Sequence, residues 1–377
     1  MRPKKKTIHI AILDVDVPVP NVYTTRGLYS TQFHSLLTAA SSRLTQQTPS
    51  QETRIHTTAF DALGGQLPSF SSLTTTPIPT SHSNTNTGKE EEKERNEISP
   101  LSIPITAILI TGSVASVYDP SLPWVPPIID FVRTVYERYP HVKIFGSCFG
   151  HQLIAHALLS NPPPTKETSN SSRSDVRVEC CPLGMEVGLE RVQLNCGFVD
   201  AFPCLNNKQE LKLQMIHGDW VSSSLLFTSE EGEEEEEEGE GKGEAPALPA
   251  PWLNVGSTDQ CPIQGLYCPG RVLSYQGHFE FDSFVNRETC VEFGRRLGWK
   301  EEMVKRYVGA IGEVDGNGDD SKLAAEVVVR FLAGEDEGHT GTEKDLNRAP
   351  EKSIGVGEWV GGLIGGLIGQ LVWSTKE

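Results

Sequence analysis

Apolar residues along this chain form short, strand-like runs that alternate with helical patterns. Residues 7–15 (TIHIAILDV) are one such run, and 26–44 repeat apolar positions at the spacing of a helix face. The order then recurs as a run at 105–112 (ITAILITG), a helical pattern at 124–139 and a run at 142–146 (VKIFG). This succession predicts an α/β fold with a doubly wound, mostly parallel sheet that has helices on both faces.

Shorter apolar runs predict further strands, and two helical patterns close the domain. The strand candidates are 177–180, 189–194 and 271–281, the last of which reads RVLSYQGHFEF. Helical spacing returns in 288–299 and 322–334. We therefore expect one domain over residues 1–335.

Three polar segments interrupt this pattern, and a glycine-rich tail follows it. The segments have too few apolar residues to offset the entropy of ordering them, so we expect disordered insertions at 66–100, 160–174 and 229–251. In the tail, 336–377, the longest apolar run lies between Glu358 and Gln370 and has 11 residues. A membrane span needs about 20. A helical or disordered tail fits best and no membrane partner is expected, although a weak membrane or self-association segment is the alternative.

The charge of the chain and its targeting signals limit the kinds of partner and the cellular compartment that we expect. The formal net charge is −17, and without residues 230–244, which hold ten Glu and one Lys, it is −8. Clustered Lys and Arg occur only in RPKKK at 2–6, so no nucleic-acid partner is expected. Asp14 and Asp16 interrupt the apolar stretch that a signal peptide would need. We expect a cytosolic protein, with the nucleus as a second location.

Eight cysteines occur without any C-x-x-C pair, which favours reduced thiols over disulfides or a zinc site. One of them, Cys148 in GSCFGHQ (146–152), lies where a strand-like run turns into a helical pattern. A helix start places unpaired N–H groups near such a residue and favours the thiolate. Cys148 is therefore a candidate nucleophile, and a buried structural cysteine is the alternative.

A cysteine nucleophile also needs a base and donors for an oxyanion. His278 and Glu280 are two residues apart in a strand-like segment, which would put both side chains on one face. Glu280 can then hold the imidazole while His278 faces the thiol. We expect the oxyanion donors to be the N–H groups near Gly112 and Ser113, in a turn after a strand, and that of Phe149.

Four motifs in this order resemble the class I glutamine amidotransferase family, and especially stand-alone members similar to the glutaminase domain of GMP synthase. They are TGSVASVYD (111–119), GSCFGHQ (146–152), HGDWV (217–221) and QGHFEF (276–281). The resemblance implies a flavodoxin-like domain that hydrolyses the γ-amide of glutamine through a γ-glutamyl thioester, without a cofactor or metal.

The resemblance also implies a role for each matching residue. Cys148 would be the nucleophile, His278 the general base and acid, and Glu280 the residue that orients it. The remaining matches would bind the oxyanion or the substrate: Gly112, Ser113, Phe149, Gln152, His217 and Asp219.

Two departures from the family pattern concern the backbone. His278-Phe279-Glu280 stands where His-Pro-Glu is usual, and the oxyanion loop reads Gly-Ser-Val rather than Gly-Gly-Pro. No Ser-Gly-Gly-x-Asp-Ser loop or Walker loop follows, so an ammonia acceptor would be a separate synthetase protein.

Three functions fit these residues. The first is a glutamine amidotransferase-type thiol hydrolase, with glutamine as its small-molecule substrate. The second is a γ-glutamyl peptidase acting on glutathione-like peptides, since both leaving groups depart from the same γ-carbonyl. The third is a catalytically silent binding or regulatory protein, for which the chain has no need of Cys148, His278 and Glu280 together.

Overall fold

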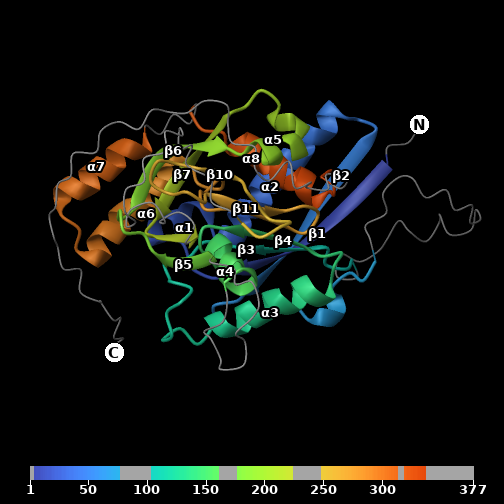
Figure 1. Cartoon of the computed structure of the whole chain (residues 1–377), viewed down its shortest axis with the longest axis horizontal. Coiled ribbons are helices and arrows are strands. Elements are labelled where there is room, and N and C mark those ends of the chain that lie inside the picture. The colour runs from blue at the N-terminus through green and yellow to red at the C-terminus, as the bar shows by residue number, and fades with distance from the viewer. Residues whose placement is uncertain (1–3, 77–102, 161–175, 224–247, 313–317, 337–377) are drawn as a thin grey trace, which may run out of the picture.

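A seven-stranded sheet lies at the centre of the computed structural model, which describes residues 4–76, 103–160, 176–223, 248–312 and 318–336 (Figure 1). Its strand order is β2-β1-β3-β4-β12-β11-β9. The strands are β2 Gln51–Asp61, β1 Lys4–Asp14, β3 Ala107–Ile110, β4 Lys143–Ser147, β12 Val272–Tyr275, β11 Gly265–Cys268 and β9 Leu253–Asn254. The first five run parallel to one another, β11 pairs with β12 in antiparallel fashion, and β9 pairs with β11 in antiparallel fashion.

Helices cover both faces of this sheet, as the succession of apolar runs predicted. Figure 1 shows α2 and α8 on one side of the strands and α3 and α4 on the other. The described helices are α1 Pro20–Arg26, α2 Tyr29–Gln47, α3 Val125–Arg138, α4 Phe149–Leu158, α5 Cys196–Ala201, α6 Ser283–Leu297, α7 Glu301–Ile311 and α8 Ser321–Leu332. The doubly wound α/β fold with a mostly parallel sheet is therefore confirmed.

The alternation of side chains along each strand divides the core into two layers. In β1, Ile10 and Ile12 pack in the layer beneath α2 and α8, whereas Ala11 and Leu13 pack in the layer beneath α3 and α4. Both layers are apolar, which explains why the strands read as continuous apolar runs. On α2, burial of Phe33, Leu37 and Leu44 contributes about 1.5–3 kcal/mol for each side chain.

Two smaller sheets lie beside the central one. The order of the first is β10-β6-β7, with β10 Gly256–Ser257, β6 Glu186–Leu194 and β7 Glu210–His217. The second pairs β5 Val176–Cys180 with β8 Asp219–Ser223 in antiparallel fashion. Because β7 ends at His217 and β8 begins at Asp219, this turn joins the two small sheets.

Most of the expected insertions and the glycine-rich tail lie outside the described residues. Of the segment 66–100, residues 66–76 are described and pack on the domain: Leu73 is buried and bridges Ile105 in parallel fashion. Phe70 stacks on Phe131 and Tyr139. These apolar contacts explain the order of a stretch that we expected to begin an insertion.

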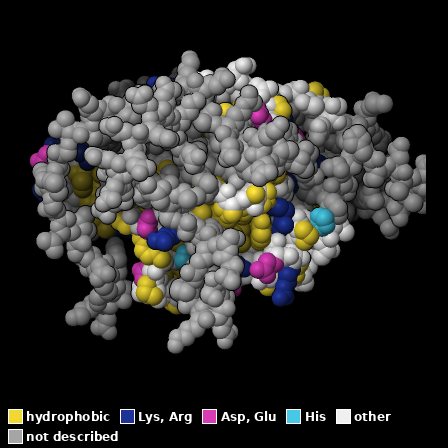
Figure 2. Space-filling view, in the orientation of Figure 1, with side chains coloured by type: hydrophobic (Ala, Val, Ile, Leu, Met, Phe, Trp, Pro, Cys, Tyr) yellow, Lys and Arg dark blue, Asp and Glu magenta, His cyan; other side chains and the backbone are white. Residues whose placement is uncertain are grey.

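The described surface shows charges of both signs. On the face seen in Figure 2, Lys and Arg side chains are interspersed with Asp, Glu and apolar ones, and the described residues form no single-sign patch there. None of the described helices combines the length and apolar character needed to cross a membrane.

Candidate active site

Cys148 occupies a sharp corner between β4 and α4, at the carboxyl edge of the parallel strands. Its backbone has φ 49° and ψ −105°, a left-handed conformation that is uncommon for a residue with a side chain. Phe149 is the first residue of α4, so its N–H has no acceptor within the helix. The corner therefore presents the Cys148 thiol beside an unpaired helix N–H group.

The glycines that flank this corner are needed for close backbone packing. A Cβ on Gly146 would lie 2.5 Å from the carbonyl carbon of Gly150, and one on Gly150 would lie 2.4 Å from the carbonyl oxygen of Ile110. The absence of a side chain at both positions therefore lets α4 lie close to β3 and β4.

His278 and Glu280 are paired, as expected, but not because they alternate along a strand. Their atoms Nδ1 and Oε1 lie 2.8 Å apart. The strand predicted for 271–281 ends at Tyr275, and His278 makes only an isolated bridge to Gln214. The pair is formed by a bend, and Ser147 donates its hydroxyl to the same Oε1 at 3.0 Å.

Phe279, where the family pattern has proline, is a core residue. Its ring is buried and makes edge contacts with Phe33, Phe145 and Tyr275 at centroid distances of 5.5, 5.6 and 5.9 Å. Packing of this ring constrains the backbone between His278 and Glu280 in place of the proline ring.

The electrostatic surroundings of His278 favour its protonated form. Burial lowers the pKa of His278, but the Glu280 carboxylate and the Cys148 sulfur more than offset this and raise it to about 10. Since Glu280 holds Nδ1, Nε2 is the ring nitrogen that remains available to a second partner. Nε2 is buried and has no hydrogen-bond partner among the described residues.

The loop after β3 lies against both His278 and Cys148. A Cβ on Gly112 would lie 3.0 Å from His278 Cε1 and 3.6 Å from Cys148 Cβ. Asp16, which follows β1, holds this loop: its Oδ2 accepts from Ser113 Oγ and from the backbone N–H of Val114, both at 3.1 Å. The Ser113 hydroxyl therefore already donates its hydrogen to another side chain of the protein.

Two cavities meet at Cys148. The smaller, ≈ 40 Å³, is lined by polar groups that include Asp16, Tyr29 and His278. The larger, ≈ 250 Å³, lies on the side of β7 and β8 and is lined by an apolar group of side chains, namely Met185, Ile216, Phe293 and Leu297. Cys148 and Ser113 line both, so a group bound at the sulfur has space on two sides.

Gln152, His217 and Asp219 lie together on the side of the larger cavity. The carbonyl oxygen of Asp219 accepts from Gln152 Nε2 at 3.0 Å, and His217 Nδ1 lies 3.0 Å from the same oxygen. The Asp219 carboxylate accepts from Ser116 Oγ at 2.6 Å and Tyr118 OH at 2.9 Å. These residues therefore connect the 217–219 turn to α4 and to the loop after β3.

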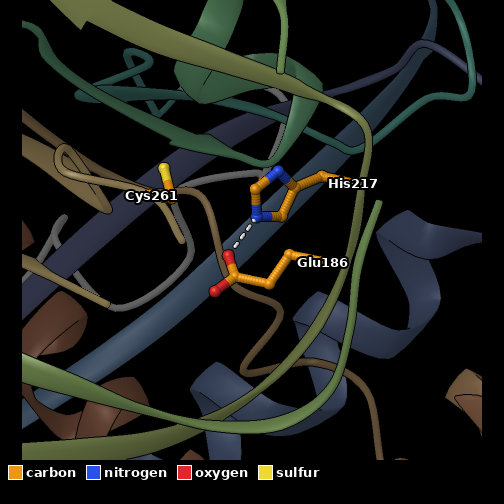
Figure 3. Close-up of side chains that lie close together, drawn as sticks. All are labelled: Glu186, His217 and Cys261. Carbon is orange, nitrogen blue, oxygen red and sulfur yellow. Dashed lines mark hydrogen bonds and ion pairs between the residues drawn. The ribbon is translucent and has the colours of Figure 1, made fainter. Parts of the chain in front are cut away.

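Three buried side chains form a group at this turn, namely Glu186, His217 and Cys261 (Figure 3). The atoms of these side chains that could bind a metal ion lie within 4.8 Å of one another. Each of the three side chains, however, already makes a hydrogen bond within the protein. His217 Nε2 lies 2.7 Å from Glu186 Oε2, and Cys261 Sγ donates to Ile263 O at 3.5 Å. Thr258 and Gln264 also donate to the Glu186 carboxylate. The contacts describe an ion pair that holds the His217 ring.

The pKa of Glu186 agrees with this description. Burial raises the pKa of its carboxyl group, but the hydrogen bond from His217, the charge of that ring, and the Thr258 and Gln264 donors lower it below its ordinary value. Glu186 is thus held as a carboxylate.

Two curated fungal proteins are similar to this chain in sequence. One, from Schizosaccharomyces pombe, is named as glutamine amidotransferase-like and is 30% identical over 232 residues, which cover 60% of this chain and 72% of that protein. This chain belongs to the glutamine amidotransferase-like family. A second family member, from Saccharomyces cerevisiae, is 30% identical over 214 residues, which cover 56% of this chain and 66% of the relative. No family model matches the chain.

Solved glutamine amidotransferases are also similar in structure. One from Thermotoga maritima has a TM-score of 0.47 at 12% identity and covers 88% of this chain and 98% of its own. Another, from Methylobacillus flagellatus, has a TM-score of 0.46 at 15% identity and covers 93% of this chain and 100% of its own.

Sequence reasoning missed several residues of this family member's site. Asp16, Ser147, Glu186 and Gln276 contact the candidate residues Ser113, Glu280, His217 and Cys148, respectively, through long-range hydrogen bonds. Ser147 and Gln276 lie within two of the matching motifs, and Asp16 carried a different signal, because a carboxylate directly after a parallel strand lies at the carboxyl edge where such sites form.

Proposed function

We propose that this chain is a thiol hydrolase that cleaves the γ-amide of glutamine, with Cys148 as nucleophile, His278 as base and acid, and Glu280 as the residue that orients the imidazole. One observation carries the proposal. The Cys148 thiol, in its left-handed corner, shares a cavity with a histidine whose Nδ1 is held 2.8 Å from a buried glutamate. The family membership supports the same reaction class.

In the first half of the reaction, the Cys148 thiolate attacks the γ-carbonyl carbon and a C–S bond forms. The oxygen that becomes negative is stabilised by the N–H of Phe149 and by the loop at Gly112 and Ser113. His278 then donates its Nε2 proton to the departing nitrogen, the C–N bond breaks, and ammonia leaves a γ-glutamyl thioester.

In the second half, water attacks the thioester carbon while His278 accepts a proton from it. The C–S bond breaks, glutamate is released, and the sulfur returns as thiolate. We propose that a separate synthetase protein takes up the ammonia. We also place the reaction in the cytosol, where thiols stay reduced, because all eight cysteines of the chain are free.

The test is release of ammonia and glutamate from glutamine by the purified full chain. The parent should turn over, and Cys148→Ala should release neither product above background. Equal rates in parent and Cys148→Ala would contradict the mechanism. No turnover by the parent, with or without candidate acceptor proteins, would favour the silent binding protein.

The larger cavity favours a second candidate, a γ-glutamyl peptidase. Ammonia needs little space, whereas ≈ 250 Å³ beside the sulfur, lined by Met185, Ile216, Phe293 and Leu297, would accept a larger and partly apolar leaving group. Glutamine and γ-glutamyl dipeptides with apolar second residues should be compared side by side. A kcat/KM that is higher for the dipeptides, and that falls in Phe293→Asp, would assign the peptidase.

A further inference from the structure

Gln276 is a buried residue whose side chain contacts the Cys148 sulfur. Its Nε2 lies 3.5 Å from Sγ, and its side chain is fully buried, so water does not compete for this contact. An amide N–H stabilises a negative sulfur more than a neutral one, because hydrogen bonds to ionised groups are stronger. The question is whether the amide presents its NH₂ group or its oxygen to the sulfur.

The neighbouring hydrogen bonds decide that orientation. Gln152 Nε2 contacts the backbone carbonyl of Asp219 at 3.0 Å, and a carbonyl can only accept, so this end of Gln152 is its NH₂ group. The same NH₂ group lies 3.1 Å from Gln276, which must therefore present its oxygen to Gln152. The NH₂ group of Gln276 is left to point at Cys148.

The backbone carbonyl of Asp219, at the start of this series of hydrogen bonds, is itself held in place. His217 Nδ1 lies 3.0 Å from it, and Nε2 of the same ring lies 2.7 Å from Glu186 (Figure 3). Two acceptors on one imidazole require two N–H donors, which only the protonated ring has. The ion pair of Glu186 and His217 thus anchors the hydrogen bonds that end at the sulfur.

We propose that Gln276 stabilises the ionised sulfur of Cys148 by donating an amide hydrogen, and that Gln152, anchored on the Asp219 carbonyl, is the positioning residue that keeps this amide in the donating orientation. The inference rests on Cys148 being the nucleophile of the proposed function. It assigns Gln276 a part in that reaction that the paired His278 and Glu280 do not perform.

Other titratable groups face Cys148 and stay in place when Gln276 is changed. From the smaller cavity these are Asp16, Tyr29, His278 and Arg296. From the larger cavity they are Cys180, His217 and Asp219. A change confined to Gln276 therefore tests the amide against an otherwise constant set of charges.

The experiment measures alkylation of Cys148 by iodoacetamide as a function of pH, read at the Cys148 peptide by mass spectrometry. Only the thiolate reacts, so the pH of half-maximal rate reports how well the protein stabilises it. In Gln276→Met this midpoint should move upward, and the rate at pH values below the parent midpoint should fall about tenfold or more. Gln152→Met should move the midpoint in the same direction by less, because the amide of Gln276 is then free to turn.

Gln214→Met is the matched control. Gln214 is equally buried, but its amide contacts Ile311 O and Asn286 rather than the sulfur, so the alkylation profile should match the parent. A parent-like profile in Gln276→Met, or a shift of the same size in Gln214→Met, would overturn the proposal. If Gln276→Met does not fold, Gln152→Met decides by the same criterion.

This test needs no substrate. A shifted profile in a protein that does not hydrolyse glutamine would support the role of Gln276 and reject the proposed function. Turnover of glutamine by the parent, together with an unshifted alkylation profile in Gln276→Met, would support the proposed function and reject the role of Gln276.

Discussion

The imidazole of His278 lies face to face with the ring of Phe281, with centroids 4.1 Å apart and planes 13° from parallel. Glu280 holds the edge of the same imidazole through Nδ1. One residue thus sets the tilt of the ring and the other its rotation, so that Nε2 stays on the side of the cavity shared with Cys148.

Loss of Glu280 should reduce turnover without abolishing it. Glu280→Ala removes the carboxylate that contacts His278 Nδ1 but leaves Cys148, the proposed nucleophile, so kcat should fall about 10²-fold. Initial-rate measurements of ammonia release, with Cys148→Ala as the inactive reference, would check this. A Glu280→Ala rate equal to that of the parent would show that Phe281 alone suffices to orient the ring.

A methyl group at Gly112 should impair the reaction through His278. The added Cβ would lie 3.0 Å from His278 Cε1, so the ring has to shift, and we expect Gly112→Ala to lower kcat about tenfold. Gly309→Ala in α7 is the control, because the new methyl group would meet no described atom within 4 Å beyond its chain neighbours and the backbone of its own helix. It should keep full activity and raise the free energy of unfolding by up to about 1 kcal/mol.

A buried ion pair far from the site should matter for stability instead. Lys143 Nζ lies 3.3 Å from Asp336 Oδ1, and both side chains are buried. Asp336→Ala leaves the ammonium without this carboxylate and should cost about 3 kcal/mol or more in the free energy of unfolding, measured in urea. The exposed pair of Asp130 and Arg133 offers the comparison, and Asp130→Ala should cost less than about 1 kcal/mol.

Acid should weaken the domain in part through Glu186. The pKa of this carboxyl group is lower in the folded protein than its ordinary value of 4.5. The stability it contributes is therefore complete above pH 4.5 and is lost as the pH falls through the folded pKa. Urea unfolding of the parent and Glu186→Gln should differ most at neutral pH and converge towards acid. A difference that grows on acidification would contradict the lowered pKa.

The sequence by itself determined the layers of the fold. Ile10 and Ala11 alternate along β1, and the apolar face of α2 repeats at helical spacing, because both periods arise from local backbone geometry. The corner at Cys148 was also predictable, since a strand-like run passes directly into a helical pattern there.

Only the tertiary structure decided which side chains surround that corner. Asp16 reaches Val114 and Gln276 reaches Cys148 across segments remote in sequence, and no local period encodes such approaches. The pairing of His278 with Glu280 was expected from strand alternation, yet a bend after β12 produces it while Phe279 packs into the core. Long-range packing, which the sequence specifies only collectively, therefore placed the groups around the thiol.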